Sequence, residues 1–110
     1  MLGRLDEAMA FGRLAVELAP GLALSHANLG SVLVTRGKLD EAKVELEKAI
    51  ALQPADVTAQ CNLAYVLAKK GQTDGAIEHF RAALRIDPDC QAAKLGIDAI
   101  ETAGGAVRGR

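Results

Sequence analysis

Residues 57–90 read VTAQCNLAYVLAKKGQTDGAIEHFRAALRIDPDC, and this stretch decides the fold because residues 23–56 repeat its pattern. The earlier unit reads ALSHANLGSVLVTRGKLDEAKVELEKAIALQPAD. Glycine, aspartate, alanine and proline recur at a step of 34 residues, and the proline column holds Pro20, Pro54 and Pro88. An internal repeat near this length indicates a solenoid of paired helices.

Each unit reads as a helix, a glycine turn and a second helix. In the first unit, Leu29 and Leu33 recur at helical spacing, and Gly37 interrupts the pattern. Asp40 then places an acid in the first turn of the second helix, where the helix dipole favours negative charge. That helix must end before Pro54, because the residue preceding a proline is disfavoured in the helical region.

Composition narrows the class of protein. Of the 110 residues, 50% are hydrophobic and 3% are aromatic, so one domain must build its core from aliphatic side chains. The formal net charge is -1, and no basic stripe indicates a nucleic-acid partner. No apolar run approaches the roughly 20 residues of a membrane-spanning helix, and the N-terminus lacks a signal-peptide layout. We therefore expect a cytoplasmic protein that neither binds nucleic acid nor inserts into a membrane.

The repeated columns resemble the tetratricopeptide repeat family over about residues 2–103. In the second unit they are Gln60, Leu63, Ala64, Leu67, Gly71, Ala76, Phe80, Ala83 and Pro88. In the first they are His26, Leu29, Gly30, Leu33, Gly37, Ala42, Leu46, Ala49 and Pro54. His26, Gln60 and Leu46 replace aromatic residues that the family prefers. The resemblance implies an all-α fold, a right-handed superhelix (α-solenoid) of antiparallel helix pairs, in which Gly30 and Ala64 face Ala42 and Ala76.

This pattern divides the chain into a repeat domain and a tail. The domain, residues 1–103, comprises the second helix of a partial repeat at 3–20, full repeats at 23–56 and 57–90, and a C-terminal capping helix at 91–103. Lys94, Asp98 and Glu101 give the last helix a polar face, as a capping helix requires. We expect residues 104–110, which include two adjacent glycines, to form a flexible tail.

The resemblance further implies that the first helix of each repeat lines a concave groove. By register, this face carries Asn28, Ser31, Thr35, Thr58, Asn62, Tyr65 and Lys69. Asn28 and Asn62 share a column, and their amides have both donors and acceptors. They can hold the backbone of a bound peptide or, alternatively, hydrogen-bond a neighbouring helix. Tyr65 is the only tyrosine, and tyrosines are frequent anchors in protein interfaces.

Some relatives in this family bind the acidic C-terminal peptides of chaperones through a clamp of lysine, asparagine and arginine. The matching positions here hold Ala27, Ser31, Asn62, Ala92 and Gly96. Only Asn62 fits, and the cationic donors that a carboxylate requires are missing. We therefore expect no binding to a free acidic C-terminal peptide.

Nothing in the sequence indicates an enzyme, a metal site or a cofactor. His26 and His79 lie on different units, without metal-ligand spacing; we expect His26 to be partly buried and satisfied, and His79 to be a solvated surface residue. Cys61 and Cys90 form no CxxC pair, and we expect two reduced thiols that behave as small hydrophobes.

The leading hypothesis is a protein–protein interaction scaffold that binds a peptide or helix of a protein partner in the groove. One alternative starts from the open N-terminal helix, where Met9 and Phe11 stand in columns that are polar or charged in the first full unit. These residues suggest a homodimer formed through that helix, although an exposed terminal helix remains an equal interpretation. A further alternative is a recruitment or regulatory segment of a larger enzyme.

Overall fold

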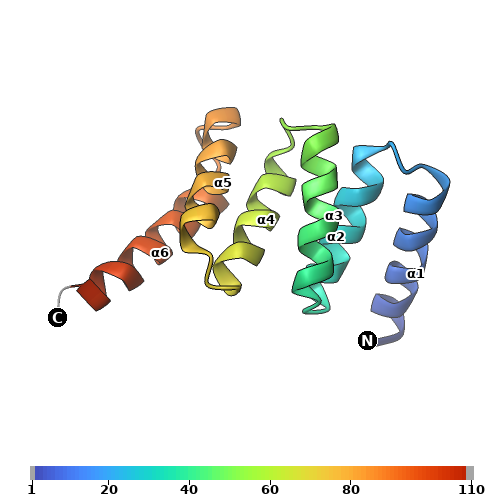
Figure 1. Ribbon diagram of the computed structural model, residues 1–110, viewed down its shortest axis with the longest axis horizontal. Helices are drawn as coiled ribbons and strands as arrows, with labels where there is room; N and C mark the ends of the chain where they lie inside the picture. Colours follow the sequence, from blue (N-terminus) through green and yellow to red (C-terminus); the bar gives the residue numbers. More distant parts are fainter. Residues whose placement is uncertain (1, 109–110) are drawn as a thin grey trace.

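The computed structural model describes residues 2–108, and these residues contain helices but no strand. The helices are α1 (Leu2–Leu18), α2 (Ala23–Thr35), α3 (Leu39–Leu52), α4 (Val57–Lys69), α5 (Thr73–Ile86) and α6 (Gln91–Arg108). Successive helices run antiparallel through short turns (Figure 1). The all-α helical-repeat solenoid predicted from the sequence is therefore confirmed.

The helices form two layers. Helix α4 contacts both α2 and α6, so these three make an inner layer, and α1, α3 and α5 pack against them as an outer layer. The molecule measures 50 × 30 × 20 Å, with its termini at opposite ends of the row of helices (Figure 1). Each inner helix thus has one side that does not contact the outer helix of its pair.

The turns between the paired helices depend on glycine. Gly37 has φ +77° and Gly71 has φ +80°, which is the left-handed region that a β-carbon disfavours. Beyond the first glycine, the N–H of Lys38 donates to the carbonyl of Leu33 over 2.9 Å. This bond satisfies a carbonyl that the helix end leaves without a partner, so the chain reverses into α3.

Small residues let the paired helices approach closely. Ala42 and Ala76 are fully buried. A β-carbon on Gly30 would lie 2.7 Å from Cγ of Leu46. The sequence suggested that Gly30 faces Ala42, whereas in the structure the glycine makes room for Leu46. A leucine side chain reaches across the contact, whereas an alanine does not.

A buried histidine braces the first full repeat. His26 is 4% exposed, and its Nε2 lies 2.6 Å from the carbonyl oxygen of Pro20. Its Nδ1 lies 2.7 Å from Oε1 of Glu45 on α3. Both ring nitrogens therefore have partners, and the expectation of a buried, satisfied histidine is confirmed.

The second full repeat builds the same brace from other residues. Gln60 donates from Nε2 to the carbonyl oxygen of Pro54 over 3.1 Å. Its Oε1 lies 2.8 Å from Nδ1 of His79 on α5. The expectation that His79 is a solvated surface residue is wrong, because this half-buried ring is held by Gln60. Gln60 and His79 lie one repeat beyond His26 and Glu45.

Helix α6 extends to Arg108 and so includes the first five residues of the predicted tail, 104–108. Glycine in a helix costs about 1 kcal/mol relative to alanine, whereas a proline would cost about 3, and no proline follows Pro88. The glycines therefore weaken the helix without ending it. Residues 109–110 of the predicted tail lie outside the described residues.

The two braces should be interchangeable. We expect His26→Ala to lower the free energy of unfolding by about 1–3 kcal/mol, because it removes the partner of two part-buried oxygen atoms, on Pro20 and Glu45. The double variant His26→Gln/Glu45→His reproduces the second brace and should recover most of that loss. Urea unfolding followed by circular dichroism measures both effects. A double variant no more stable than His26→Ala would show that the two braces are not equivalent.

Candidate functional site

The seven residues predicted for the groove lie on α2 and α4 of the inner layer. Five of them are exposed and two, Ser31 and Asn62, are half-buried. They follow one another three or four residues apart, so they share one side of each helix, opposite buried residues such as Leu33 and Leu67. We call this exposed side of α2 and α4 the inner face.

The two asparagines of the inner face differ in their surroundings. Asn62 donates from Nδ2 to Oγ of Ser31 over 3.0 Å and so bridges α4 to α2. Asn28 is exposed, and its equivalent partner would lie on an inner helix before α1, which the described residues do not contain. Of the two interpretations left open by the sequence, the hydrogen bond to a neighbouring helix is observed for Asn62.

An aromatic and a cation lie together on the inner face, at the C-terminal end of α4. Tyr65 is 45% exposed, and Nζ of Lys69, one turn further along α4, lies 5.6 Å from the centroid of its ring. This is cation–π geometry. The contact restrains a large amphipathic side chain before any partner arrives, so less side-chain entropy is lost on binding.

Gly96 ends the asparagine column on α6. A β-carbon at this position would lie 2.3 Å from Cζ of Phe80, a distance that no real structure tolerates without movement. The column therefore needs glycine here, because Phe80 is bulkier than Leu46 in the preceding repeat. This close contact determines how α6 packs against α5.

A shallow hollow adjoins the inner face at the α1–α2 end, with a volume of about 440 Å³. It is lined by Leu22, Ala23, Leu24, Leu52, Gln53 and Asp56. Leu24 is 60% exposed and belongs to the same side of α2 as Asn28. Sequence reasoning missed the hollow, because Leu52 comes from the far end of α3 and only the pairing of α2 with α3 brings it here.

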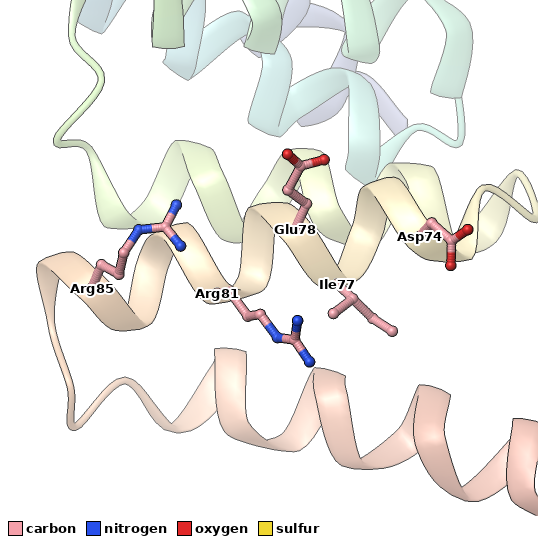
Figure 2. Close-up of a pocket in the computed structure, with 5 residues that line it drawn as sticks. All are labelled: Asp74, Ile77, Glu78, Arg81 and Arg85. Carbon is pink, nitrogen blue, oxygen red and sulfur yellow. The ribbon is translucent and has the colours of Figure 1, made fainter.

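A second shallow pocket, of about 500 Å³, lies on α5 in the outer layer. All its lining residues come from this one helix: Asp74, Ile77, Glu78, Arg81 and Arg85. Figure 2 shows Ile77 and Arg81 directed toward α6 and Glu78 directed away from it. The mixed charges select no single class of ligand, and none of the residues predicted for the groove lies here.

Two ion pairs in equivalent positions of successive repeats link an inner helix to an outer helix. Arg36 at the end of α2 pairs with Asp6, and Lys70 at the end of α4 pairs with Asp40. The hydrogen bond from Lys70, together with its charge, holds the pKa of Asp40 below its ordinary value of 3.8. A carboxylate whose pKa is lowered in the folded state stabilises the fold at pH values above its ordinary pKa. This stabilisation is lost as the pH falls through the lowered pKa. Both pairs are solvent-exposed, which keeps their effect small.

The exposed side of α1 carries three large apolar residues. Phe11 is 70% exposed, Leu14 48% and Leu18 77%. Met9, which the sequence grouped with Phe11, instead packs against the core, because it lies on the side of α1 that faces α2. Phe11 stands one repeat before Glu45, whose side chain contacts the inner helix of its own unit.

The two cysteines are free thiols, as expected, but they are also in contact, which the sequence did not predict. Sγ of Cys61 lies 3.7 Å from Sγ of Cys90. Cys61 comes from α4, and Cys90 immediately precedes α6. The sequence separates them by 29 residues, and only the packing of α6 on α4 brings them together.

Within residues 2–108, no group of three or more histidine, cysteine, aspartate or glutamate side chains is arranged to hold a metal ion. In the same part of the chain, none of the helices combines the length and the apolar character that a bilayer crossing demands.

Comparisons with known proteins agree with this architecture. A tetratricopeptide repeat model matches residues 28–89. The crystal structure of MamA is 26% identical, covering 94% of this chain and 61% of that chain, with a TM-score of 0.88. The Arabidopsis OM64 TPR domain is 19% identical, covering 92% and 84%, with a TM-score of 0.88.

A third similar structure is the second TPR domain of human RPAP3 in complex with the HSP70 peptide SGPTIEEVD. It is 20% identical, covers 90% of this chain and 82% of that chain, and has a TM-score of 0.84. At this identity the likeness concerns the fold. A comparison with curated protein sequences finds no significant match.

Two glycines of α6 provide a matched test of the contact with Phe80. We expect Gly96→Ala to destabilise the protein by about 1–3 kcal/mol, because its β-carbon overpacks against the ring. Gly104 has open space around it, so Gly104→Ala should stabilise the helix by about 0.5–1 kcal/mol. Thermal unfolding of both variants gives the two signs. If Gly96→Ala were stabilising as well, α6 would not be seated on Phe80 as described.

Proposed function

This chain belongs to the tetratricopeptide repeat family, and from that premise we propose that it is a protein–protein interaction module whose inner face binds an extended or helical segment of a partner. The exposed Tyr65 beneath Lys69 carries this proposal. A large, restrained aromatic on a polar surface is the kind of residue that dominates binding energy in protein interfaces.

The surroundings of Tyr65 indicate what such a segment offers. Asn28, Thr35 and Thr58 are exposed on the same face and can pair with the amides and carbonyls of a peptide backbone. Leu24 and the adjoining hollow accept an apolar side chain. Lys69 is the only charged group among the seven inner-face residues, so the face suits a segment that is largely uncharged.

The RPAP3 domains among the similar structures were solved with HSP70 and HSP90 peptides, but we do not transfer those ligands to this chain. Of the positions that match the family clamp of lysine, asparagine and arginine, only Asn62 fits, and the others hold Ala27, Ser31, Ala92 and Gly96. Gly96 is moreover occupied by its contact with Phe80. An acidic peptide carboxylate would lose its hydration here without gaining a cationic partner.

Peptide selection from a random display library, followed by titration of the selected peptide, tests the inner face. We expect Asn28→Ala/Tyr65→Ala to weaken binding at least about tenfold, as loss of an aromatic anchor does. Asn62 is left unchanged, because its amide holds Ser31 and its removal would disturb the packing of α4 on α2.

The outer face of α5 supplies the matched control. Glu78→Ala/Arg81→Ala removes two of the four charged side chains of the pocket in Figure 2 and should leave the affinity unchanged. The acidic peptide SGPTIEEVD serves as a negative ligand. Loss of binding in the α5 variant alone, or micromolar binding of the acidic peptide, would contradict the proposed site.

A second candidate function, self-association, is favoured by the exposed side of α1. Phe11, Leu14 and Leu18 form an apolar stripe in the place where the paired helix of a complete repeat would pack. We propose that two copies cover this stripe with each other. Met9 has no part in the contact, since it already packs against the core.

Sedimentation over a range of concentrations tests the dimer, because the stability of a dimer follows mass action. We expect wild type to dimerise as concentration rises and Phe11→Ser/Leu18→Ser to remain monomeric. Leu95→Ser removes an apolar side chain that is 64% exposed at the opposite end of the row and should behave as wild type. A wild-type chain that stays monomeric throughout would exclude self-association through α1.

A further inference from the structure

The contact between Cys61 and Cys90 has no part in the proposed function. Their sulfur atoms lie 3.7 Å apart, with both side chains half-buried. A disulfide needs about 2.05 Å between the sulfurs. The two sulfurs are thus already in contact, and forming the bond requires only that they move closer together.

The backbone on both sides of the contact is held in place. Cys61 lies within α4, and Cys90 makes two backbone hydrogen bonds at the start of α6: its N–H donates to the carbonyl of Asp87, and its own carbonyl accepts from Lys94. Both side chains pack against the same apolar cluster, which includes Phe80 and Ala93. The proximity of the sulfurs therefore follows from the packing of whole helices rather than from one loose loop.

The corresponding residues of the first repeat show that the fold does not need two thiols. One repeat earlier, the two columns hold Ala27 and Asp56, and Asp56 caps α4 by accepting from the N–H of Ala59 over 3.1 Å. Alanine and a polar capping residue thus occupy the equivalent two positions of the first repeat. The cysteine pair is an addition of the second repeat.

We propose that Cys61 and Cys90 are a redox modification site, at which a low-molecular-weight disulfide oxidises the two thiols to an intramolecular disulfide that ties α6 to α4. One cysteine, after losing its proton to solvent, attacks the small disulfide, forms a mixed disulfide and releases one thiolate. The other cysteine then loses its proton and attacks the protein sulfur of the mixed disulfide, which closes the Cys61–Cys90 bond and releases the second thiolate. The two released thiolates take up protons, so two protein thiols are oxidised and one small disulfide is reduced.

The surroundings make the reduced pair slow to react and the product durable. Burial, followed by the hydrogen bond with Cys90, raises the pKa of Cys61 to about 12. The reactive thiolate is therefore scarce at neutral pH. A strongly oxidising disulfide has a reduced form that is stabilised as a thiolate. The reduced form of this pair gains no such stabilisation, so the closed disulfide should resist reduction.

The cross-link would act on the last helix of the row. Helix α6 ends the row and packs only against α5 and α4 among the described helices, and terminal elements open most readily. A disulfide at its first turn closes a loop across 29 residues and reduces the entropy of the unfolded chain. Oxidation should therefore slow the opening of α6.

Incubation of the full reduced chain with excess glutathione disulfide at alkaline pH tests the proposal. We expect wild type to lose two hydrogens by intact mass, to keep no glutathione and to remain free of disulfide-linked dimers. Its melting temperature should rise by about 10 °C, and hydrogen exchange in α6 should slow. Retained glutathione on wild type, cross-linked dimers, or an internal disulfide without the rise in melting temperature would each overturn the proposal.

Cysteine variants give the matched controls. Cys61→Ala carries the residue of the preceding repeat, and Cys90→Ser keeps a good capping residue at the start of α6. Each single variant lacks the second thiol, so at least one should retain glutathione as a mixed disulfide. The double variant should melt at the same temperature with and without the oxidant; a rise in this variant would place the effect elsewhere than at the cysteine pair and overturn the assignment.

Discussion

The close approach of a small residue on one helix to a large side chain on its neighbour is the contact on which the rest of this structure depends. Gly30 admits Leu46 between α2 and α3, and Gly96 admits Phe80 between α6 and α5. Because protein interiors pack at crystal-like density, these pairs determine how near the helices come. The seat of α6 on Phe80 in turn places Cys90 against Cys61.

Polar contacts then orient what hydrophobic packing brings together. Hydrophobic burial is not directional, whereas His26 and Gln60 each reach a proline carbonyl and a side chain of the paired helix. Different residues thus produce one geometry in two repeats. In the partial repeat, Phe11 occupies the position of Glu45 and His79. It is 70% exposed, because the described residues include no inner helix for it to contact.

The inner face is less regular than the fold that carries it. Asn62 is held by Ser31 while Asn28 is exposed, and the column ends in a glycine that packing requires. Structures of the same fold with bound chaperone peptides therefore describe the scaffold without specifying the ligand of this chain. Under the proposed function, its specificity depends on Tyr65, Lys69 and the apolar hollow beside Leu24.

The repeat, the order of the helices and the glycine turns were predictable from the sequence alone, because helical periodicity and the left-handed conformation at Gly37 are local properties. The helix beyond Ala103 was missed because glycines weaken a helix without stopping it. The partners of Asn62 and His79, the burial of Met9 and the contact between Cys61 and Cys90 were decided only by the tertiary structure. Each depends on the distance and angle between helices far apart in the chain, which side-chain packing sets and no local pattern records.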